Sequence, residues 1–193
     1  MAKATDHEIV SIYGHSEEQK QELLKRAPEC VLMWGTKDHW PVGVVHSFLW
    51  AEDKVWVTFA AHRHRAAAIR RDPRVSVAVS GRSSDDPLCP LGTVTVKGRG
   101  EFCEDDEKKH WFYRELSKKL FGADPAAEQS FYELLDSPLR LVLEITPEKW
   151  ISFDADKSAR HRSGELDESE LTPLQSADAQ RRIKELEKRG LAE

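Results

Sequence analysis

The sequence lacks the features that mark exported or membrane-spanning proteins. No run of about 18 apolar residues is present to cross a membrane, and the first residues, MAKATDHEIV, lack the apolar core of a signal peptide. The three cysteines, Cys30, Cys89 and Cys103, are odd in number and show no CxxC spacing. Reduced thiols are the simplest interpretation, so we expect a cytoplasmic protein that does not bind membranes.

Common catalytic and nucleotide-binding motifs are also missing. The chain has no GxSxG elbow for a nucleophilic serine, no HExxH or clustered Cys/His set for a metal, and no GxxxxGK[ST] phosphate loop. Gly98-Arg99-Gly100 lacks the third glycine and the following helix of a dinucleotide-binding motif. We therefore expect neither a hydrolase triad nor a P-loop or Rossmann enzyme, and we predict no metal site.

The balance of charge argues against general nucleic-acid binding. The 34 acidic residues outnumber the 29 basic ones and give a net charge of −5, whereas binding to nucleic acid needs a basic face. A local basic patch can still serve a single phosphate. The length of 193 residues predicts one domain with ample chain for a core.

The most informative stretch runs from Lys54 to Ser80. Apolar residues recur at every second position over 54–60, and this period of two predicts a β-strand. Three consecutive alanines favour a short helix over 66–71, which Pro73 discourages from continuing. A second strand is predicted over 74–80.

The turn between the first strand and the helix is basic. His62, Arg63, His64 and Arg65 follow one another there, next to a helix N-terminus whose backbone N–H groups lack partners. The two arginines can each bind a phosphomonoester through paired hydrogen bonds. The turn therefore predicts a phosphate site, and a solvated basic turn is the alternative that this stretch alone leaves open.

The other segments predict a mainly β protein of the α+β class. Ser16 and Gln19 form a capping box for a helix over 16–27. Further helices are predicted over 105–121 and 125–135. The remaining strands are predicted at 30–36, 41–50, 92–103, 139–145 and 150–153, the last two hinged at Pro147. About seven strands with helices inserted late suit a small closed barrel better than a parallel doubly wound sheet.

The basic turn and its flanks resemble the flavin-binding split β-barrel family, which includes pyridoxamine 5′-phosphate oxidase, bacterial flavin reductases and deazaflavin-dependent enzymes. The matching residues are Thr58, Arg63, Arg65 and the junction Asp72-Pro73-Arg74-Val75. The family usually has Lys at the position of Arg65, and Arg keeps the charge while adding a planar donor fork. The resemblance extends over residues 29–154 and implies a homodimeric split barrel of about six to seven strands with peripheral helices.

The resemblance implies FMN as the cofactor and a set of residues that bind its phosphate. Arg63 and Arg65 would pair with the phosphate, and the hydroxyl of Thr58 would donate a further hydrogen bond. His64 would assist if it is exposed.

The resemblance also implies where the isoalloxazine ring lies. The ring would lie along the strand that precedes the basic-turn region, whose residues there are Val45, His46, Ser47 and Phe48. Lys97, Arg99 and Trp150 would act across the dimer interface. Ordinary packing is an equally good explanation for Trp150.

The expected function is an FMN-dependent oxidoreductase acting on a small organic substrate. The chain has Gly92-Thr93-Val94-Thr95-Val96 where the oxidase itself has Arg-Gln before a Val-Arg-Ile run, which argues against vitamin B6 oxidation. The alternatives are a deazaflavin-dependent reductase or a non-catalytic haem- or flavin-binding protein, with His46, His62 or His64 as haem ligands. No side chain is assigned as a catalytic acid or base.

The composition changes near residue 155. We expect residues 1–155 to form the flavin-binding domain, and residues 156–193 to form a charged linker followed by a helix or tail. The loop at 81–91, rich in Ser, Asp and Pro, is long enough to be a lid or a mobile edge.

Overall fold

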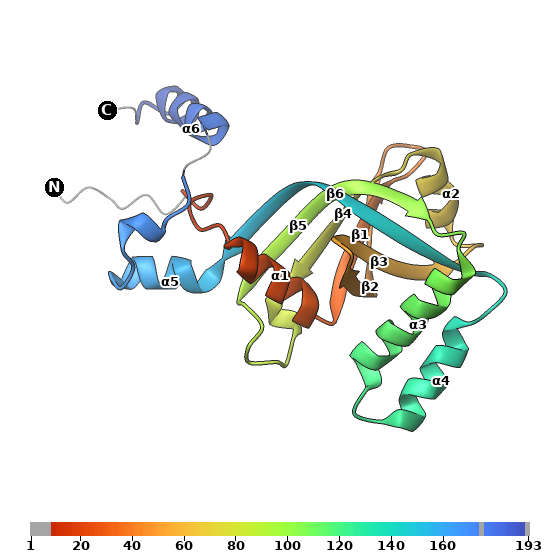
Figure 1. Cartoon of the computed structure of the whole chain (residues 1–193). Coiled ribbons are helices and arrows are strands. Elements are labelled where there is room, and N and C mark those ends of the chain that lie inside the picture. The colour runs from red at the N-terminus through yellow and green to blue at the C-terminus, as the bar shows by residue number, and fades with distance from the viewer. Residues whose placement is uncertain (1–8, 174–175, 192–193) are drawn as a thin grey trace.

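The centre of the protein is a closed antiparallel barrel of six strands, seen in a computed structural model that describes residues 9–173 and 176–191 (Figure 1). The order around the barrel is β1-β2-β3-β6-β5-β4, so each strand has a neighbour on both sides. The strands are β1 (Glu29–Gly35), β2 (Pro41–Ala51), β3 (Lys54–Ala60), β4 (Arg74–Ser80), β5 (Gly92–Phe102) and β6 (Arg140–Asp154). The expected barrel of the α+β class, with helices at its periphery, is confirmed.

Side-chain alternation fills the barrel. On β3, Val55, Val57 and Phe59 are buried and belong to the main hydrophobic cluster, as the period of two in the sequence predicts. The face of β3 that points away from the barrel is covered too, because Trp56 is fully buried there and packs against Phe112. Burial of each large apolar side chain contributes about 1.5–3 kcal/mol, so both faces of this strand stabilise the fold.

The last two predicted strands are a single long strand, which brings the total to six. β6 runs from Arg140 to Asp154 without interruption and pairs with β5 along its length. Pro147 lacks an N–H to donate, and the pairing shifts register beside it, between Lys97 and Gly98 of β5. A Cβ at Gly98 would lie 2.3 Å from the carbonyl oxygen of Thr146, so this close approach requires glycine. The bulge accommodates the proline without ending the strand.

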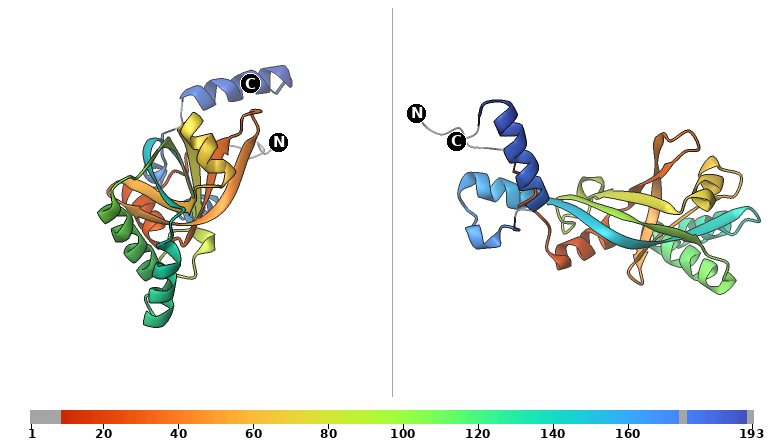
Figure 2. Two further views of the ribbon diagram at one scale, coloured as in Figure 1. Left: turned by 90° about the vertical axis from the view of Figure 1, so that its right-hand side faces the viewer. Right: turned by 90° about the horizontal axis from the view of Figure 1, so that it is seen from above.

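The helices lie outside the barrel. They are α1 (Glu17–Arg26), α2 (His64–Arg71), α3 (Asp106–Phe121), α4 (Pro125–Leu135), α5 (Ala155–Ser163) and α6 (Ser176–Lys188), with single 3-10 turns at Gly81–Ser83 and Glu168–Glu170. The capping box predicted for α1 is present, because Ser16 and Gln19 exchange side chain–backbone hydrogen bonds. α3 and α4 form an antiparallel pair beside the barrel at the end opposite α5 (Figures 1 and 2).

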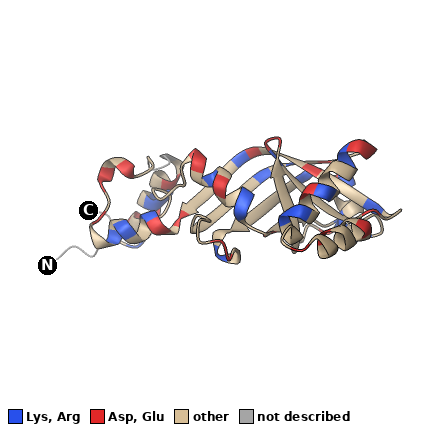
Figure 3. Cartoon of the chain, turned by 60° about the horizontal axis from the view of Figure 1, so that its bottom comes forward, with Lys and Arg blue, Asp and Glu red and all other residues tan. Residues whose placement is uncertain are grey.

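The end of β6 is joined directly to α5, in the segment for which we expected a linker. Asp154 caps α5 by accepting a hydrogen bond from the backbone N–H of Lys157. The segment after α5 also contacts the N-terminal segment, since Thr172 donates its N–H to the carbonyl of Ile12. α6 stands away from the barrel (Figure 2), and both C-terminal helices carry basic as well as acidic residues (Figure 3).

The described helices include none with the length and apolar character that crossing a membrane requires.

Candidate functional site

The basic turn leads directly into α2. The turn is closed by a hydrogen bond from the N–H of Arg63 to the carbonyl of Ala60, and α2 begins at His64, two residues earlier than the alanine run predicts. Arg63 occupies the N-cap position, and its side chain makes no capping hydrogen bond. The first N–H groups of α2 therefore have no side-chain acceptor, which is the arrangement that binds anions at helix N-termini.

Arg65 is held over two aromatic rings. Its guanidinium carbon lies 5.4 Å from the ring centroid of Trp34 and 5.3 Å from that of Phe59. Trp34 and Phe59 are buried residues of the barrel core, so the cation is fixed at the mouth of the barrel. Burial, and then the neighbouring charge of Arg63, lowers the pKa of Arg65 from its usual value. The guanidinium remains charged, because so high a pKa leaves it protonated near neutrality.

The guanidinium of Arg65 has no anionic partner within the described residues. Its Nε is buried and lacks any hydrogen-bond partner there. An unpaired, partly buried charge costs free energy, and proteins normally satisfy such groups. Arg65 is thus prepared to accept an anion from outside the chain.

His46 completes this end of the barrel. Its ring lies 5.9 Å from that of Phe59, and its Nε2 is buried without a partner among the described residues. Burial, followed by the charge of Arg65, lowers the pKa of His46 to about 4, so the ring is neutral at physiological pH. We refer to the two arginines, Arg63 and Arg65, together with the neutral His46 beside them, as the cationic end of the barrel. Arg63 and the helix residue His64 are exposed at its rim.

Strand alternation divides the predicted ring-binding segment between two faces. His46 and Phe48 face the interior, and the side chain of Phe48 is 0% exposed within the core. Val45 and Ser47 point outward, and Val45 is 57% exposed. A planar ring therefore cannot contact all four side chains, and the outer face offers Val45 and Ser47.

Outward-facing side chains form a row that crosses five strands of the barrel. Strand register aligns one row across β2, β1, β4, β5 and β6, which consists of Val45, Val31, Ala78, Thr95 and Ile151. Several of these residues line an apolar hollow of about 280 Å³. We call this row the outer row; its side chains are short or β-branched, so the surface stays smooth.

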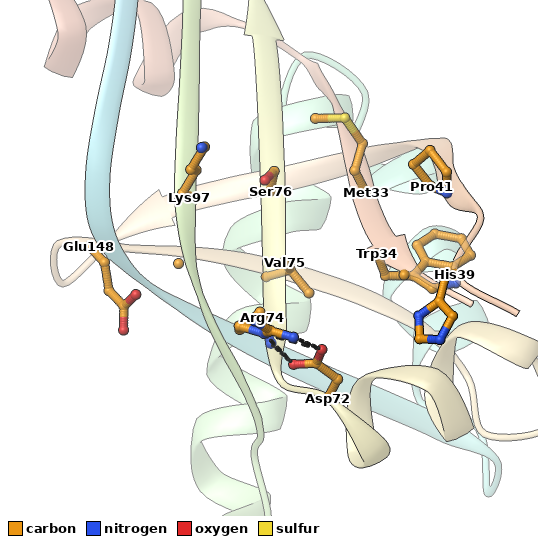
Figure 4. Close-up of a pocket in the computed structure, with 12 residues that line it drawn as sticks. Met33, Trp34, His39, Pro41, Asp72, Arg74, Val75, Ser76, Lys97 and Glu148 are labelled. Atoms are coloured by element: carbon orange, nitrogen blue, oxygen red, sulfur yellow. Dashed lines mark hydrogen bonds and ion pairs between the residues drawn. The ribbon is translucent and has the colours of Figure 1, made fainter. Parts of the chain in front are cut away.

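A larger pocket of about 630 Å³ adjoins the outer row at the next step along the strands (Figure 4). Met33, Ser76 and Lys97 lie side by side there, on β1, β4 and β5. Lys97, which the resemblance assigns to the cofactor, has no ion-pair partner among the described residues. The other cations nearby are neutralised, because Arg74 pairs with Asp72 and Arg99 pairs with Glu148.

Two of the predicted residues are engaged elsewhere. The hydroxyl of Thr58 donates to the carbonyl of Leu141 at 2.7 Å, on the face of β3 opposite Phe59, so it does not point towards Arg65. Trp150 packs edge-on against Trp50 at 5.7 Å, with the ammonium of Lys20 of α1 over its ring at 5.4 Å. The Thr58 hydroxyl and the Trp150 ring are therefore not directed at Arg65, although the backbone of Thr58 contacts the side chain of His46.

Sequence reasoning missed Trp34, Phe59 and the pocket residues Met33 and Ser76. Alternation indicates only that residues such as Met33 and Ser76 share a face, and strand order decides that they meet. The aromatic platform under Arg65 has no local signal, because Trp34 and Phe59 come from different strands. Over residues 9–173 and 176–191, no three His, Cys, Asp or Glu side chains gather as a metal site.

Comparison with known proteins places the fold in a family. Among solved structures, a conserved hypothetical protein of Mycobacterium tuberculosis is 20% identical, with a TM-score of 0.64 over 81% of this chain and 92% of that one. A FAD-binding protein of Mesorhizobium loti is 19% identical, with a TM-score of 0.54 over 73% and 96% of the two chains. The haem storage protein of Vibrio cholerae is 12% identical, with a TM-score of 0.51 over 72% and 93%.

At these identities the solved structures establish the fold alone. No curated protein matches the chain. The profile described as pyridoxamine 5′-phosphate oxidase matches residues 16–154, which include the whole barrel from α1 to the end of β6. On this match, the chain belongs to the pyridoxamine 5′-phosphate oxidase family of barrels.

Proposed function

We propose that the protein binds FMN at the cationic end and acts as a flavin-dependent oxidoreductase on a small organic substrate. The observation that carries the proposal is the unpaired guanidinium of Arg65 beside the uncapped N-terminus of α2. Arg63 adds a second, exposed cation at the rim, which has no ion-pair partner among the described residues. A phosphomonoester would satisfy both arginines and the free N–H groups of the helix.

The outer face suits the aromatic part of the cofactor. Val45, Val31 and Ala78 line an apolar hollow, Ser47 is half-buried on the same face of β2, and Lys97 lines the adjoining pocket. Bound flavin would supply hydride transfer, while the chain anchors the phosphate, orients the ring and excludes water. The relative from Mesorhizobium loti, described as FAD-binding, supports a flavin of this class.

A second copy of the chain is the proposed cover for the outer row. Val45 is 57% and Ile151 50% exposed at the two ends of this row, which leaves an apolar strip across five strands. In a homodimer this strip would be buried and the ring enclosed between subunits. Light scattering on the Val45→Glu variant tests this: we expect a monomer, and an unchanged dimer would place the interface elsewhere.

The direct test of the cofactor is spectroscopic. We expect the purified protein to show flavin absorption, or to quench the fluorescence of added FMN. Arg65→Met should weaken FMN binding by roughly 10- to 100-fold, because a charge-assisted hydrogen bond is worth about 1.5–3 kcal/mol. Arg71→Met, on the opposite end of α2, is the matched control and should bind FMN normally. Equal affinities in the two variants would contradict the phosphate assignment.

Haem and deazaflavin are the alternative ligands. His46 favours haem in one respect, since its Nε2 has no partner and its low pKa keeps the ring neutral, as an iron ligand must be. A Soret band lost in His46→Ala would establish haem binding. A protein that ignores FMN and haem but binds deazaflavin would assign it to the reductases of that cofactor.

A further inference from the structure

Lys119 of α3 is a half-buried lysine outside the proposed cofactor site. Its Nζ donates a hydrogen bond to the carbonyl of Phe48 at 3.0 Å and lies 4.1 Å from the centroid of the Phe48 ring. Phe48 is part of the barrel core, so the side chain of Lys119 reaches from α3 to β2. These contacts fix the position of the nitrogen and leave it without a carboxylate partner among the described residues.

The surroundings of Lys119 favour the neutral amine. Burial lowers its pKa to about 8, and the thiols of Cys30 and Cys89 oppose this only weakly. Burial also raises the pKa of Cys30 to about 12 and raises that of Cys89, so both thiols stay uncharged. Near neutral pH a much larger fraction of such an amine is deprotonated than of a lysine of ordinary pKa near 10.4.

Lys119 also lines a hollow in the protein surface. It has a volume of about 360 Å³ and is lined by Leu49, Trp50, Lys25, Glu115, Lys118 and Lys119. Lys25 and Lys118 are exposed at its rim. Lys25 lies 3.6 Å from the carboxylate of Glu22, whereas Lys118 has no ion-pair partner among the described residues and contributes a positive charge. The volume admits a small acyl compound, and the rim attracts one that carries negative charge.

We propose that Lys119 is a site of self-acylation by small anionic acyl donors of the acyl phosphate class. The lone pair of Nζ attacks the carbonyl carbon and forms a C–N bond. The C–O bond to phosphate breaks, and phosphate leaves with the electron pair. The amine loses its extra proton to water or to Glu115, which lines the same hollow, and a neutral amide remains. The reaction needs no oxidant or reductant.

Acylation would alter the strand that carries the proposed cofactor residues. The amide retains one N–H that can still bond to the Phe48 carbonyl, but the positive charge over the Phe48 ring is lost. Val45, Ser47 and Phe48 all belong to β2, so the modification acts on the cofactor strand from its inner side. The acylation itself does not depend on which cofactor the barrel binds.

The test is site-resolved acetylation of the full-length protein by acetyl phosphate. Mass spectrometry of peptides should show Lys119 acetylated at least about tenfold faster than its neighbour Lys118, since a larger fraction of the amine is neutral. The rate at Lys119 should level off above pH 8 to 9. A rate no greater than that of Lys118, or one that still climbs steadily to pH 10, would overturn the proposal. This measurement uses the unaltered chain and needs no variant to fold.

Two variants sharpen the result. Lys119→Arg keeps the charge and should abolish only the rapid modification, with the circular dichroism spectrum unchanged. Lys118→Gln should slow acetylation of Lys119 by acetyl phosphate several-fold but not by the neutral donor para-nitrophenyl acetate. An equal effect on both donors, or none, would contradict recognition of an anionic donor.

Discussion

The two ends of the barrel differ in whether the chain supplies hydrogen-bond or ion-pair partners for a charged side chain. At the α1/α5 end, Asp154 accepts hydrogen bonds from the Gln19 side chain at 2.8 Å and the Lys157 N–H at 2.9 Å, and lies 3.5 Å from His15. Its side chain is only 3% exposed, yet the protein supplies its partners. At the α2 end, Arg65 is partly buried with no partner from the described chain.

The difference indicates a structural role for Asp154, and it is the reason why we propose a binding role for Arg65. A buried charge with a full set of partners is explained by folding alone, since it joins α1, β6 and α5. A buried charge without partners costs stability, and the fold retains it at the mouth of the barrel. The α2 end is therefore where we propose that a ligand binds. At the α1/α5 end the two ring nitrogens of His15 are also buried without a hydrogen-bond partner among the described residues, so the contrast concerns the two charged groups, Asp154 and Arg65. The following predictions test whether the two ends are as different as their contacts indicate.

The largest effect on stability is expected at the α1/α5 end of the barrel. Asp154→Ala removes the cap of α5 and the acceptor of Gln19, and should lower the free energy of unfolding by about 2–4 kcal/mol. Asp156→Ala, an exposed change in the same helix, should cost far less. Thermal unfolding of both variants measures this, and FMN affinity of the folded Asp154→Ala protein should be nearly normal. Equal losses in the two variants would show that Asp154 is not a structural centre.

At the α2 end, removing the charged group should not lower the stability of the protein. Arg65→Met removes an unpaired cation and keeps an apolar stem over Trp34 and Phe59, so the cofactor-free protein should unfold at the same temperature or slightly higher. A marked loss of stability without any ligand would mean that Arg65 is structural. The comparison between the two ends would then fail.

Anion binding should be coupled to protonation of His46. Burial, and then the charge of Arg65, lowers the pKa of His46 to about 4 in the free protein, and an anion on Arg65 would raise it. Binding then takes up protons, so affinity should increase a few-fold as the pH falls from 7 to 5. Sulfate is the suitable probe because its charge is constant in this range, and the titration can follow intrinsic fluorescence. His46→Gln should remove the pH dependence; its persistence would show that His46 is not coupled to the anion.

The smallest effect is expected from the titration of His15 at the α1/α5 end. Its pKa lies below the usual value, chiefly through burial, although Asp154 opposes the shift and Lys157 adds to it. A histidine with a lowered folded-state pKa contributes stability above its unfolded pKa near 6.5 and loses it as the pH falls further. The melting temperature should therefore drop by a few degrees between pH 7 and pH 5. A His15→Gln protein with the same slope would assign the drop to other groups.

Local signals in the sequence determined much of the fold. The Ser16–Gln19 capping box, the helix at 125–135, the strand at 54–60 and the strand at 74–80 all follow from residues a few positions apart, and each is found in the structure. The basic turn was also predicted from the sequence, because four cationic or titratable residues are consecutive in the chain. These features depend on caps, periodicity and backbone restriction, which act over one or two turns.

Only the tertiary structure decided what those residues face. Pro147 was expected to divide two strands, but a bulge at Gly98, 49 positions away, keeps β6 continuous. The hydroxyl of Thr58 is held by Leu141, and Arg65 lies between rings from two strands. The low pKa of Lys119 likewise comes from burial where α3 meets β2, and five other elements separate these two in the chain. The sequence determines periodicity because neighbours in the chain set it, whereas burial and pairing depend on segments that meet only once the barrel closes.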